Sequence, residues 1–282
     1  GEVPGNVLNQ FSMDEYNGNF RIATTTGNWR ETSLNHLYVL DENLEISGSV
    51  EDLAKGERIY STRFLGDRAY MVTFKQVDPL FVIDLSDAKN PEVLGYLKVT
   101  GYSSYLHPYD ENTIIGVGME ANEQGRTAGM KIAVFDVSDV NNPVEKSKYE
   151  FEKGSYSDSL YEHKAFLFDK SRELLVIPVQ TYDYSNYNNN WQGAYVFKIN
   201  LDEISLKGKI THQENFTKNQ YGYVEFDYTK QIQRSLFMDN ILYTVSQSKI
   251  KANDLETVDE INSLDLGYEE DYYPYYEGGI AI

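Results

Sequence analysis

The residues best suited to ligand chemistry lie in one aromatic and amide-rich stretch. Residues 180–193 read Gln-Thr-Tyr-Asp-Tyr-Ser-Asn-Tyr-Asn-Asn-Asn-Trp-Gln-Gly. Flat aromatic faces beside amide and carboxylate groups suit sugars, and Tyr and Trp are also frequent anchors for protein partners. The candidate ligand-binding residues are Tyr182, Asp183, Tyr184, Tyr187 and Trp191, joined by Trp29 and Arg30 from an earlier loop. The alternatives are a self-packed loop whose rings cover neighbouring strands, and an Arg30 that pairs with an acidic residue.

A second set of candidates is cationic. Arg63, Lys164 and Arg234 fall near equivalent positions of three repeated units, on strands expected to line a central channel. Three inward cations in an acidic protein would suit an anionic ligand. The alternative is that they neutralise carboxylates in the channel or beside it.

The sequence offers little for catalysis. It has no Gly-x-Ser-x-Gly elbow and no Walker loop. A carbohydrate-active enzyme remains an alternative, because two carboxylates at the channel mouth can come from different units; Asp158, Glu162 and Glu225 are the candidates.

Metal and cofactor chemistry is also weakly supported. The four His residues show no His-x-x-x-His or His-Glu-x-x-His spacing, and there is no Cys. Abundant oxygen ligands suit Ca²⁺ better than zinc, but no EF-hand loop or RTX nonapeptide is present. No catalytic residue, metal ligand or cofactor is therefore predicted.

Charge and hydropathy exclude several partners. The 282 residues contain 44 Asp and Glu against 25 Lys and Arg, a formal net charge of −19. Such a surface repels phosphate backbones and anionic membranes, so nucleic-acid binding is not expected. No apolar run approaches the roughly 20 residues of a membrane span. Gly1 indicates a processing site or a cloning remnant, so a targeting segment is expected to have been removed.

An internal repeat in the sequence predicts the scaffold that positions these candidate residues. Residues 79–93 and 130–144 each contain a β-rich run, then Asp-x-Ser-Asp, then Asn-Pro and a second β-rich run. Asp and Ser side chains bond the turn backbone and Pro fixes φ at its exit, so each copy predicts two strands and one defined turn.

Each unit has two more strands before this hairpin, and we call the earlier of the two the first element of the unit. These first elements are predicted at residues 9–14, 60–67, 102–110, 163–169 and 233–239. The result is five units of four strands, with the shorter spacings close to the 40 to 50 residues of a propeller blade. The sequence therefore predicts an all-β fold, a β-propeller of about five four-stranded antiparallel blades over residues 1–266. Residues 267–282 form an acidic, Tyr-rich tail.

Loop lengths then predict a functional face. Residues 26–35, 119–129 and 180–193 each connect the second and third strands of a unit, and residues 212–223 connect two units. In a propeller blade these connections emerge on the same side. Long loops on a rigid scaffold are where binding residues usually lie, so this face is predicted to be functional.

Two stretches of the chain resemble a known family. Residues 7–16 (Val-Leu-Asn-Gln-Phe-Ser-Met-Asp-Glu-Tyr) with residues 20–25, and residues 163–168 leading into residues 174–179, resemble secreted bacterial and archaeal proteins. Those proteins carry a C-terminal β-propeller distantly related to WD40 repeats. The resemblance also includes the turn at residues 85–91. It implies a secreted or cell-surface propeller, no catalytic residues to carry over, and a parent protein with further blades.

These observations lead to one functional hypothesis and two rivals. The hypothesis is an extracytoplasmic, non-catalytic binding module that uses the long-loop face for a glycan or a protein. The rivals are a carbohydrate-active enzyme and a structural cell-surface protein. No nucleic acid and no membrane insertion are expected.

Overall fold

Five antiparallel sheets, which we call blades 1 to 5, form the propeller; four of them have four strands, and in blade 4 two short strands share the position of the first strand. The computed structural model describes residues 1–28, 32–74, 78–122, 126–183, 185–186, 189–213, 217–218 and 224–267. The prediction of five four-stranded blades is confirmed. Within the described residues no helix is long and apolar enough to cross a membrane.

The strands of each blade follow one another in chain order. Blade 1 contains β1 (Met13–Tyr16), β2 (Asn19–Thr26), β3 (Leu34–Leu40) and β4 (Ile46–Leu53). Blade 2 contains β5 (Arg58–Leu65), β6 (Arg68–Phe74), β7 (Asp78–Asp84) and β8 (Glu92–Val99). Blade 3 contains β9 (Tyr102–Asp110), β10 (Thr113–Ala121), β11 (Thr127–Asp136) and β12 (Val144–Glu150). Blade 4 contains β13 (Ser155–Tyr156), β14 (Leu167–Asp169), β15 (Leu174–Thr181), β16 (Trp191–Ile199) and β17 (Ile204–Ile210). Blade 5 contains β20 (Arg234–Met238), β21 (Ile241–Val245), β22 (Lys249–Asp254) and β23 (Glu260–Asp265).

The repeated Asp-x-Ser-Asp motif forms the predicted turn between third and fourth strands. Asp84 accepts a hydrogen bond from the Ser86 amide at 2.9 Å, and Asp87 accepts from the Lys89 amide at 2.9 Å. The second copy repeats this arrangement, with Asp136 bonded to Ser138 and Asp139 bonded to Asn141. These side chains satisfy turn amides, as the sequence predicted.

Two of the predicted first strands are wrong in part. Asn9 lies before β1 and caps the short 3-10 helix η1 (Gln10–Ser12) by accepting from the Phe11 amide at 3.0 Å. Residues 163–169 form a strand only at β14. Their start is η3 (His163–Ala165), capped by Glu162, which follows η2 (Asp158–Leu160). Side chains that bond nearby backbone amides therefore replaced a regular inner strand in blade 4.

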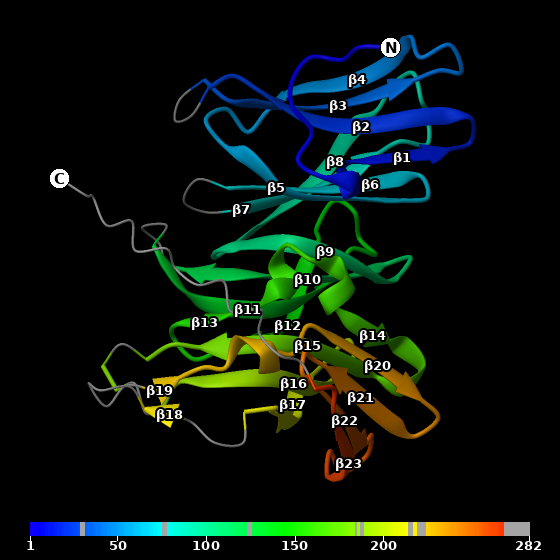
Figure 1. Ribbon diagram of the computed structural model, residues 1–282. Helices are drawn as coiled ribbons and strands as arrows, with labels where there is room; N and C mark the ends of the chain where they lie inside the picture. Colours follow the sequence, from blue (N-terminus) through cyan, green and yellow to red (C-terminus); the bar gives the residue numbers. More distant parts are fainter. Residues whose placement is uncertain are drawn as a thin grey trace, which may run out of the picture.

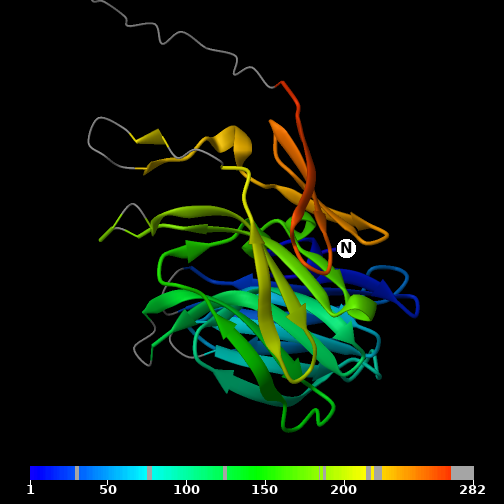
Figure 2. The same cartoon turned by 90° about the horizontal axis from the view of Figure 1, so that it is seen from below.

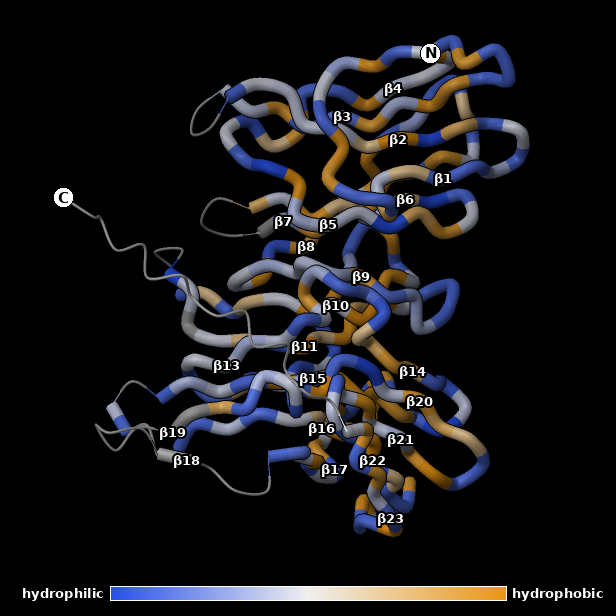
Figure 3. Tube along the Cα trace, viewed as in Figure 1, coloured by the Kyte–Doolittle hydropathy of each residue, from blue (hydrophilic) through white to orange (hydrophobic). Residues whose placement is uncertain are grey.

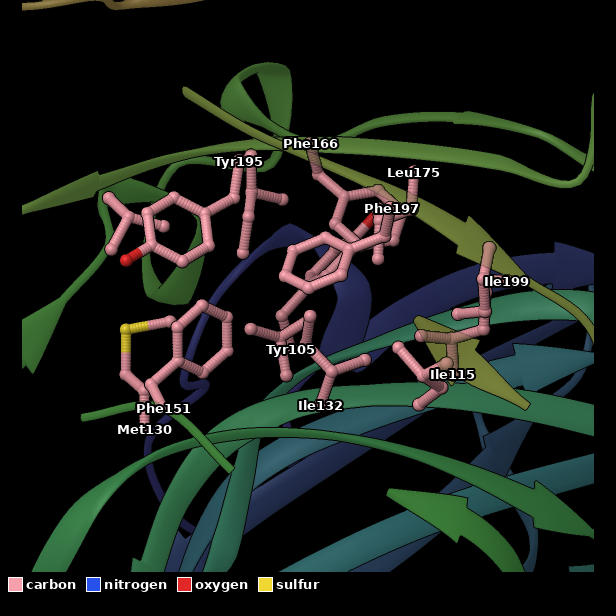
Figure 4. Close-up of a cluster of buried hydrophobic side chains, with 14 of the residues drawn as sticks. Tyr105, Ile115, Met130, Ile132, Phe151, Phe166, Leu175, Tyr195, Phe197 and Ile199 are labelled. Carbon is pink, nitrogen blue, oxygen red and sulfur yellow. The ribbon is translucent and has the colours of Figure 1, made fainter. Parts of the chain in front are cut away.

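The blades stack along an arc, with blade 1 and blade 5 at its two ends (Figure 1) and the curvature visible from below (Figure 2). Apolar side chains fill each gap between neighbouring blades. Figure 4 shows the largest of these clusters, where Tyr105, Ile115 and Ile132 of blade 3 meet Leu175, Tyr195 and Phe197 of blade 4. Because side chains alternate along a strand, each central strand contributes to two such clusters.

The long connections emerge on one side, as predicted. The ends of β2, β6, β10 and β15 all lie on the left of Figure 1, where the short β18–β19 hairpin also projects. We call this side the loop face. Two loops are shorter than predicted, because β10 continues to Ala121 before β11 begins at Thr127, and β15 continues to Thr181 before β16 begins at Trp191.

Candidate functional site

A large cavity lies where the inner strands meet the loop face, and its volume is about 770 Å³. The N-terminal segment, β5, β9 and the η2–η3 segment form its walls. Ser33, Gly56 and Phe74 lie at the loop-face ends of blades 1 and 2 and form its rim. Sequence reasoning placed the site on this face but did not find the cavity.

Aromatic rings dominate the cavity wall. They are contributed by Phe11, Tyr60, Phe74, Tyr105 and Tyr161. Tyr161 is 74% exposed, so its ring is available to a ligand at the mouth. A concave, mostly apolar site with few polar groups is the usual form of a binding pocket.

The N-terminal segment is held in place as part of this wall. The Asn6 amide donates to the Thr25 carbonyl at 2.9 Å, which fastens the segment to β2. Phe11 packs edge-on against Tyr105 at 5.6 Å and against His163 at 5.2 Å between ring centroids. The Phe11 side chain therefore contacts blade 3 and the η3 segment that precedes β14 of blade 4.

Next to Tyr105 of the cavity wall, β9 and the segment of residues 166–168 carry a ladder of rings in edge-on or tilted contact. His107 lies 4.8 Å from Phe166 and 5.2 Å from Phe168, and Tyr109 lies 5.4 Å from Phe168. Tyr105 joins this ladder, since its ring centroid is 5.2 Å from Phe166.

The electrostatics of the site differ from those of the whole chain. None of the described residues that line the cavity is Asp or Glu, whereas Arg58 and His163 are among them. Below the wall, burial lowers the pKa of the Arg63 guanidinium and raises the pKa of Tyr105. Burial, with a smaller contribution from Arg63, lowers the pKa of His107 to about 4. His107 is therefore neutral at pH 7, and its Nδ1 lies 3.0 Å from the Tyr105 hydroxyl.

The three predicted channel cations have different environments. Arg63 Cζ lies over the Phe11 ring at 4.5 Å, and no carboxylate contributes to the shift of its pKa. Lys164 is exposed and is not among the residues that line the cavity. Arg234 pairs with Glu162 at 3.8 Å and donates to the Gln233 carbonyl at 2.8 Å. Arg234 therefore has the carboxylate contact that the alternative interpretation expects.

The predicted loop residues fall partly outside the described part of the chain, where Trp29, Arg30, Tyr184 and Tyr187 lie. Tyr182 donates its hydroxyl to Gln180 Oε1 at 2.8 Å. The loop therefore uses this residue for its own packing.

Asp183 has hydrogen-bond partners inside the loop, whereas Trp191, the first residue of β16, packs on blade 4. Hydrogen bonds from the Ser185 hydroxyl and the Asn189 amide lower the pKa of Asp183 to about 2. Trp191 packs edge-on against Tyr195 at 5.1 Å, and Lys209 Nζ lies 5.4 Å from its ring centroid. The described residues thus have the contacts that a self-packed loop requires.

Of the carboxylates proposed for an enzyme, the two whose side chains the structure describes, Asp158 and Glu162, do not line the cavity. Burial raises the pKa of Asp158, which accepts from Gln231 Nε2 at 3.1 Å. A hydrogen bond from the Lys164 amide lowers the pKa of Glu162. Neither residue lines the cavity, and the Glu225 side chain is outside the described residues.

Metal-ligating side chains are dispersed. Across the described ranges no group of three or more His, Asp or Glu is close enough to hold a metal ion. Two of the His residues bond nearby side chains instead: His36 Nε2 lies 2.7 Å from the Thr26 hydroxyl, and His163 Nδ1 lies 3.1 Å from Gln10 Nε2.

Comparison with known proteins agrees with this architecture. An uncharacterized protein of Methanocaldococcus jannaschii is 39% identical over 277 residues, which are 98% of this chain and 39% of that protein. An uncharacterized protein of Archaeoglobus fulgidus is 37% identical over 267 residues, 94% of this chain and 36% of that protein. The chain thus spans less than two fifths of these relatives.

A solved structure shows the same fold. It is that of apo AztD from Citrobacter koseri, with a TM-score of 0.53 and 14% identity over 91% of this chain and 60% of that one. The family described as "Beta propeller domain" matches residues 1–258. With five consecutive four-stranded blades and this match over nearly its whole length, the chain belongs to the beta propeller domain family.

Proposed function

We propose that this propeller is a non-catalytic binding module that holds a hydrophobic segment of a protein partner in the aromatic cavity of the loop face. The observation that carries the proposal is the coincidence of the cavity with the face from which the long loops emerge. Interfaces take most of their binding energy from a few aromatic and apolar anchors in such desolvated pockets.

A protein partner suits the cavity better than a glycan. Sugar sites need several hydrogen-bonding amide and carboxylate groups beside the stacking ring. Asn9 supplies an amide here, but the described wall has no carboxylate. The loop residues predicted for sugar stacking, Tyr182 and Trp191, have intramolecular contacts instead.

A matched pair of tyrosines tests the cavity. Tyr161 lines the mouth and is 74% exposed, while Tyr228 is 71% exposed and is not part of the cavity wall. Peptides selected from a displayed random library on the wild-type protein should bind Tyr161→Ser about tenfold more weakly, because an anchor contact is worth about 1–2 kcal/mol. Binding to Tyr228→Ser should be unchanged.

A glycan array and a loop variant separate the competing assignments. Replacement of residues 182–190 by a short turn should leave peptide binding intact if the cavity is the site. Equal binding of the selected peptides to all variants would remove the cavity assignment. Glycans on the array that bind the wild-type protein but not the loop variant would instead support a glycan site on the loop.

The proposal places the protein outside the cytoplasm, at the cell surface or secreted. It is supported by the resemblance of residues 7–16 and 163–168 to secreted proteins. Protease treatment of intact cells tests it: the protein should be digested, and full protection in intact cells would contradict the extracytoplasmic location.

A further inference from the structure

A second cavity adjoins the aromatic cavity of the loop face, and its volume is about 360 Å³. Its wall includes the amide-bearing residues Asn6 and Asn28. Leu8 and Arg58 line both cavities, so the two are neighbours. Figure 3 shows a hydrophobic stretch and then a hydrophilic stretch in the N-terminal segment, which contributes residues to both walls. A ligand that fills both cavities therefore meets an aromatic part and a polar part.

The charge of the two walls is opposite to that of the whole chain. None of the described residues that line either cavity is Asp or Glu, although 44 of the 282 residues are acidic. Arg58 is exposed and borders both cavities. A guanidinium in such a wall is complementary to a negative charge on the ligand, because it can donate two parallel hydrogen bonds to a carboxylate.

The fold fixes the backbone that carries this guanidinium. Arg58 is the first residue of β5 and pairs with Phe74 of β6, which lines the aromatic cavity. The next residue, Ile59, is only 5% exposed, so the start of the strand is anchored in the core. The preceding residue, Glu57, accepts a hydrogen bond from the Thr73 hydroxyl at 2.5 Å and does not line either cavity. Blade 2 thus presents the cation at the junction of the cavities and its acidic neighbour elsewhere.

We infer that the segment bound by the aromatic cavity carries an Asp or Glu side chain beside its apolar anchor, and that this carboxylate pairs with Arg58. The inference rests on the proposed function and narrows the partner to an acidic, hydrophobic polypeptide segment. A side chain suits Arg58 better than a C-terminal carboxylate does. Because Arg58 borders both cavities, a segment that fills both continues past this point and cannot end there.

The selected peptides test the charge directly. Peptides selected from the displayed random library on the wild-type protein should be enriched in Asp or Glu close to an aromatic or aliphatic residue. A synthetic peptide with this Glu replaced by Gln should bind about fivefold more weakly, as expected for a partly exposed ion pair. The affinity of the Glu peptide should also fall with added salt more steeply than that of the Gln peptide. Equal affinities of the two peptides would overturn the inference.

A matched pair of arginines assigns the charge to its partner. Arg58→Met should weaken binding of the Glu peptide about fivefold and change binding of the Gln peptide little, whereas Arg58→Lys should retain most of the affinity for the Glu peptide. Arg172→Met is the control, because Arg172 is also exposed but lines neither cavity. An equal loss for the Glu and Gln peptides on Arg58→Met would show that no ion pair forms.

Two further measurements separate the possible failures. If Tyr161→Ser weakens binding of both peptides but Arg58→Met affects neither, the aromatic cavity is the site and the carboxylate pairing is wrong. If Tyr161→Ser binds both peptides as the wild type does, the proposed function fails, and this inference fails with it. Amidation of the peptide C-terminus should leave the affinity unchanged. A loss on amidation that matches the loss on Arg58→Met would replace the side-chain carboxylate by a terminal one.

Discussion

The guanidinium of Arg63 lies over the ring of Phe11, with 4.5 Å between Cζ and the ring centroid. Phe11 belongs to the N-terminal segment and Arg63 to the inner strand of blade 2. Their contact therefore joins the cavity wall to the inner surface of the propeller. Among the described residues no carboxylate contributes to the pKa shift of Arg63, and the contact places this cation over an electron-rich ring face.

We predict a coupling energy of about 1 kcal/mol between these two side chains. A double-mutant cycle of Phe11→Leu and Arg63→Met, followed by urea denaturation, measures it. Leucine keeps most of the apolar volume while it removes the ring face. Additive single-variant effects would show that the contact contributes nothing to stability.

A buried ion pair in blade 1 gives a second prediction. Arg21 is 2% exposed and donates to both carboxylate oxygens of Asp14, at 2.7 and 2.5 Å, and to the Gly66 carbonyl at 2.6 Å. Asp14→Ala leaves a buried cation unpaired and should lower the free energy of unfolding by about 3 kcal/mol. The double variant with Arg21→Met should be more stable than Asp14→Ala. A double variant less stable than the single one would contradict this interpretation.

The neutral state of His107 makes stability depend on pH. Burial lowers its pKa from 6.5 to about 4, so between these values the unfolded chain binds a proton that the folded state excludes. The contribution of neutral His107 to the free energy of unfolding is fully present above pH 6.5 and is lost as the pH falls toward 4. It amounts to at most about 3 kcal/mol.

His107→Phe removes this group while it keeps a ring beside Phe166 and Phe168. The difference in unfolding free energy between pH 7 and pH 4 should therefore be smaller in this variant than in the wild type. In the wild-type protein, the NMR signal of the His107 ring should titrate near pH 4. A midpoint near 6.5 would contradict the predicted burial effect.

Two glycines with similar backbone angles should respond differently to a methyl group. Gly18 has φ +74° and open space around it, whereas Gly101 has φ +77° and a Cβ there would lie 2.0 Å from the Met119 carbonyl oxygen. Gly18→Ala should cost about 1 kcal/mol, because an L-residue is strained at this φ. Gly101→Ala should cost at least about 2 kcal/mol more, because blade 3 must also shift. Thermal denaturation measures both losses of stability. Equal losses for the two variants would contradict this prediction and would show that the strand ends near Gly101 can shift at little energetic cost.

Local chemistry explains why the fold was predictable. The turn residues Asp84 and Asp87 bond amides two or three positions away, so their role depends only on nearby sequence. Alternation of apolar residues then sets which side of each strand is buried. The same locality explains the error in blade 4, because Glu162 bonds the Lys164 amide and begins η3 where a strand was expected.

The candidate site was less predictable, since its wall combines residues distant in the chain. Phe11 and His163 are in contact although about half of the chain separates them. No local pattern indicated that Tyr161 would lie at the same cavity as Phe11.

The sequence by itself determined the blade repeat, the turn chemistry and the side from which long loops emerge, because these depend on hydrogen bonds and side-chain alternation within short segments. Only the tertiary structure decided which rings converge on the cavity and which cations meet a carboxylate. Those features depend on how whole sheets pack against one another, and such packing brings together residues whose separation along the chain carries no local signal.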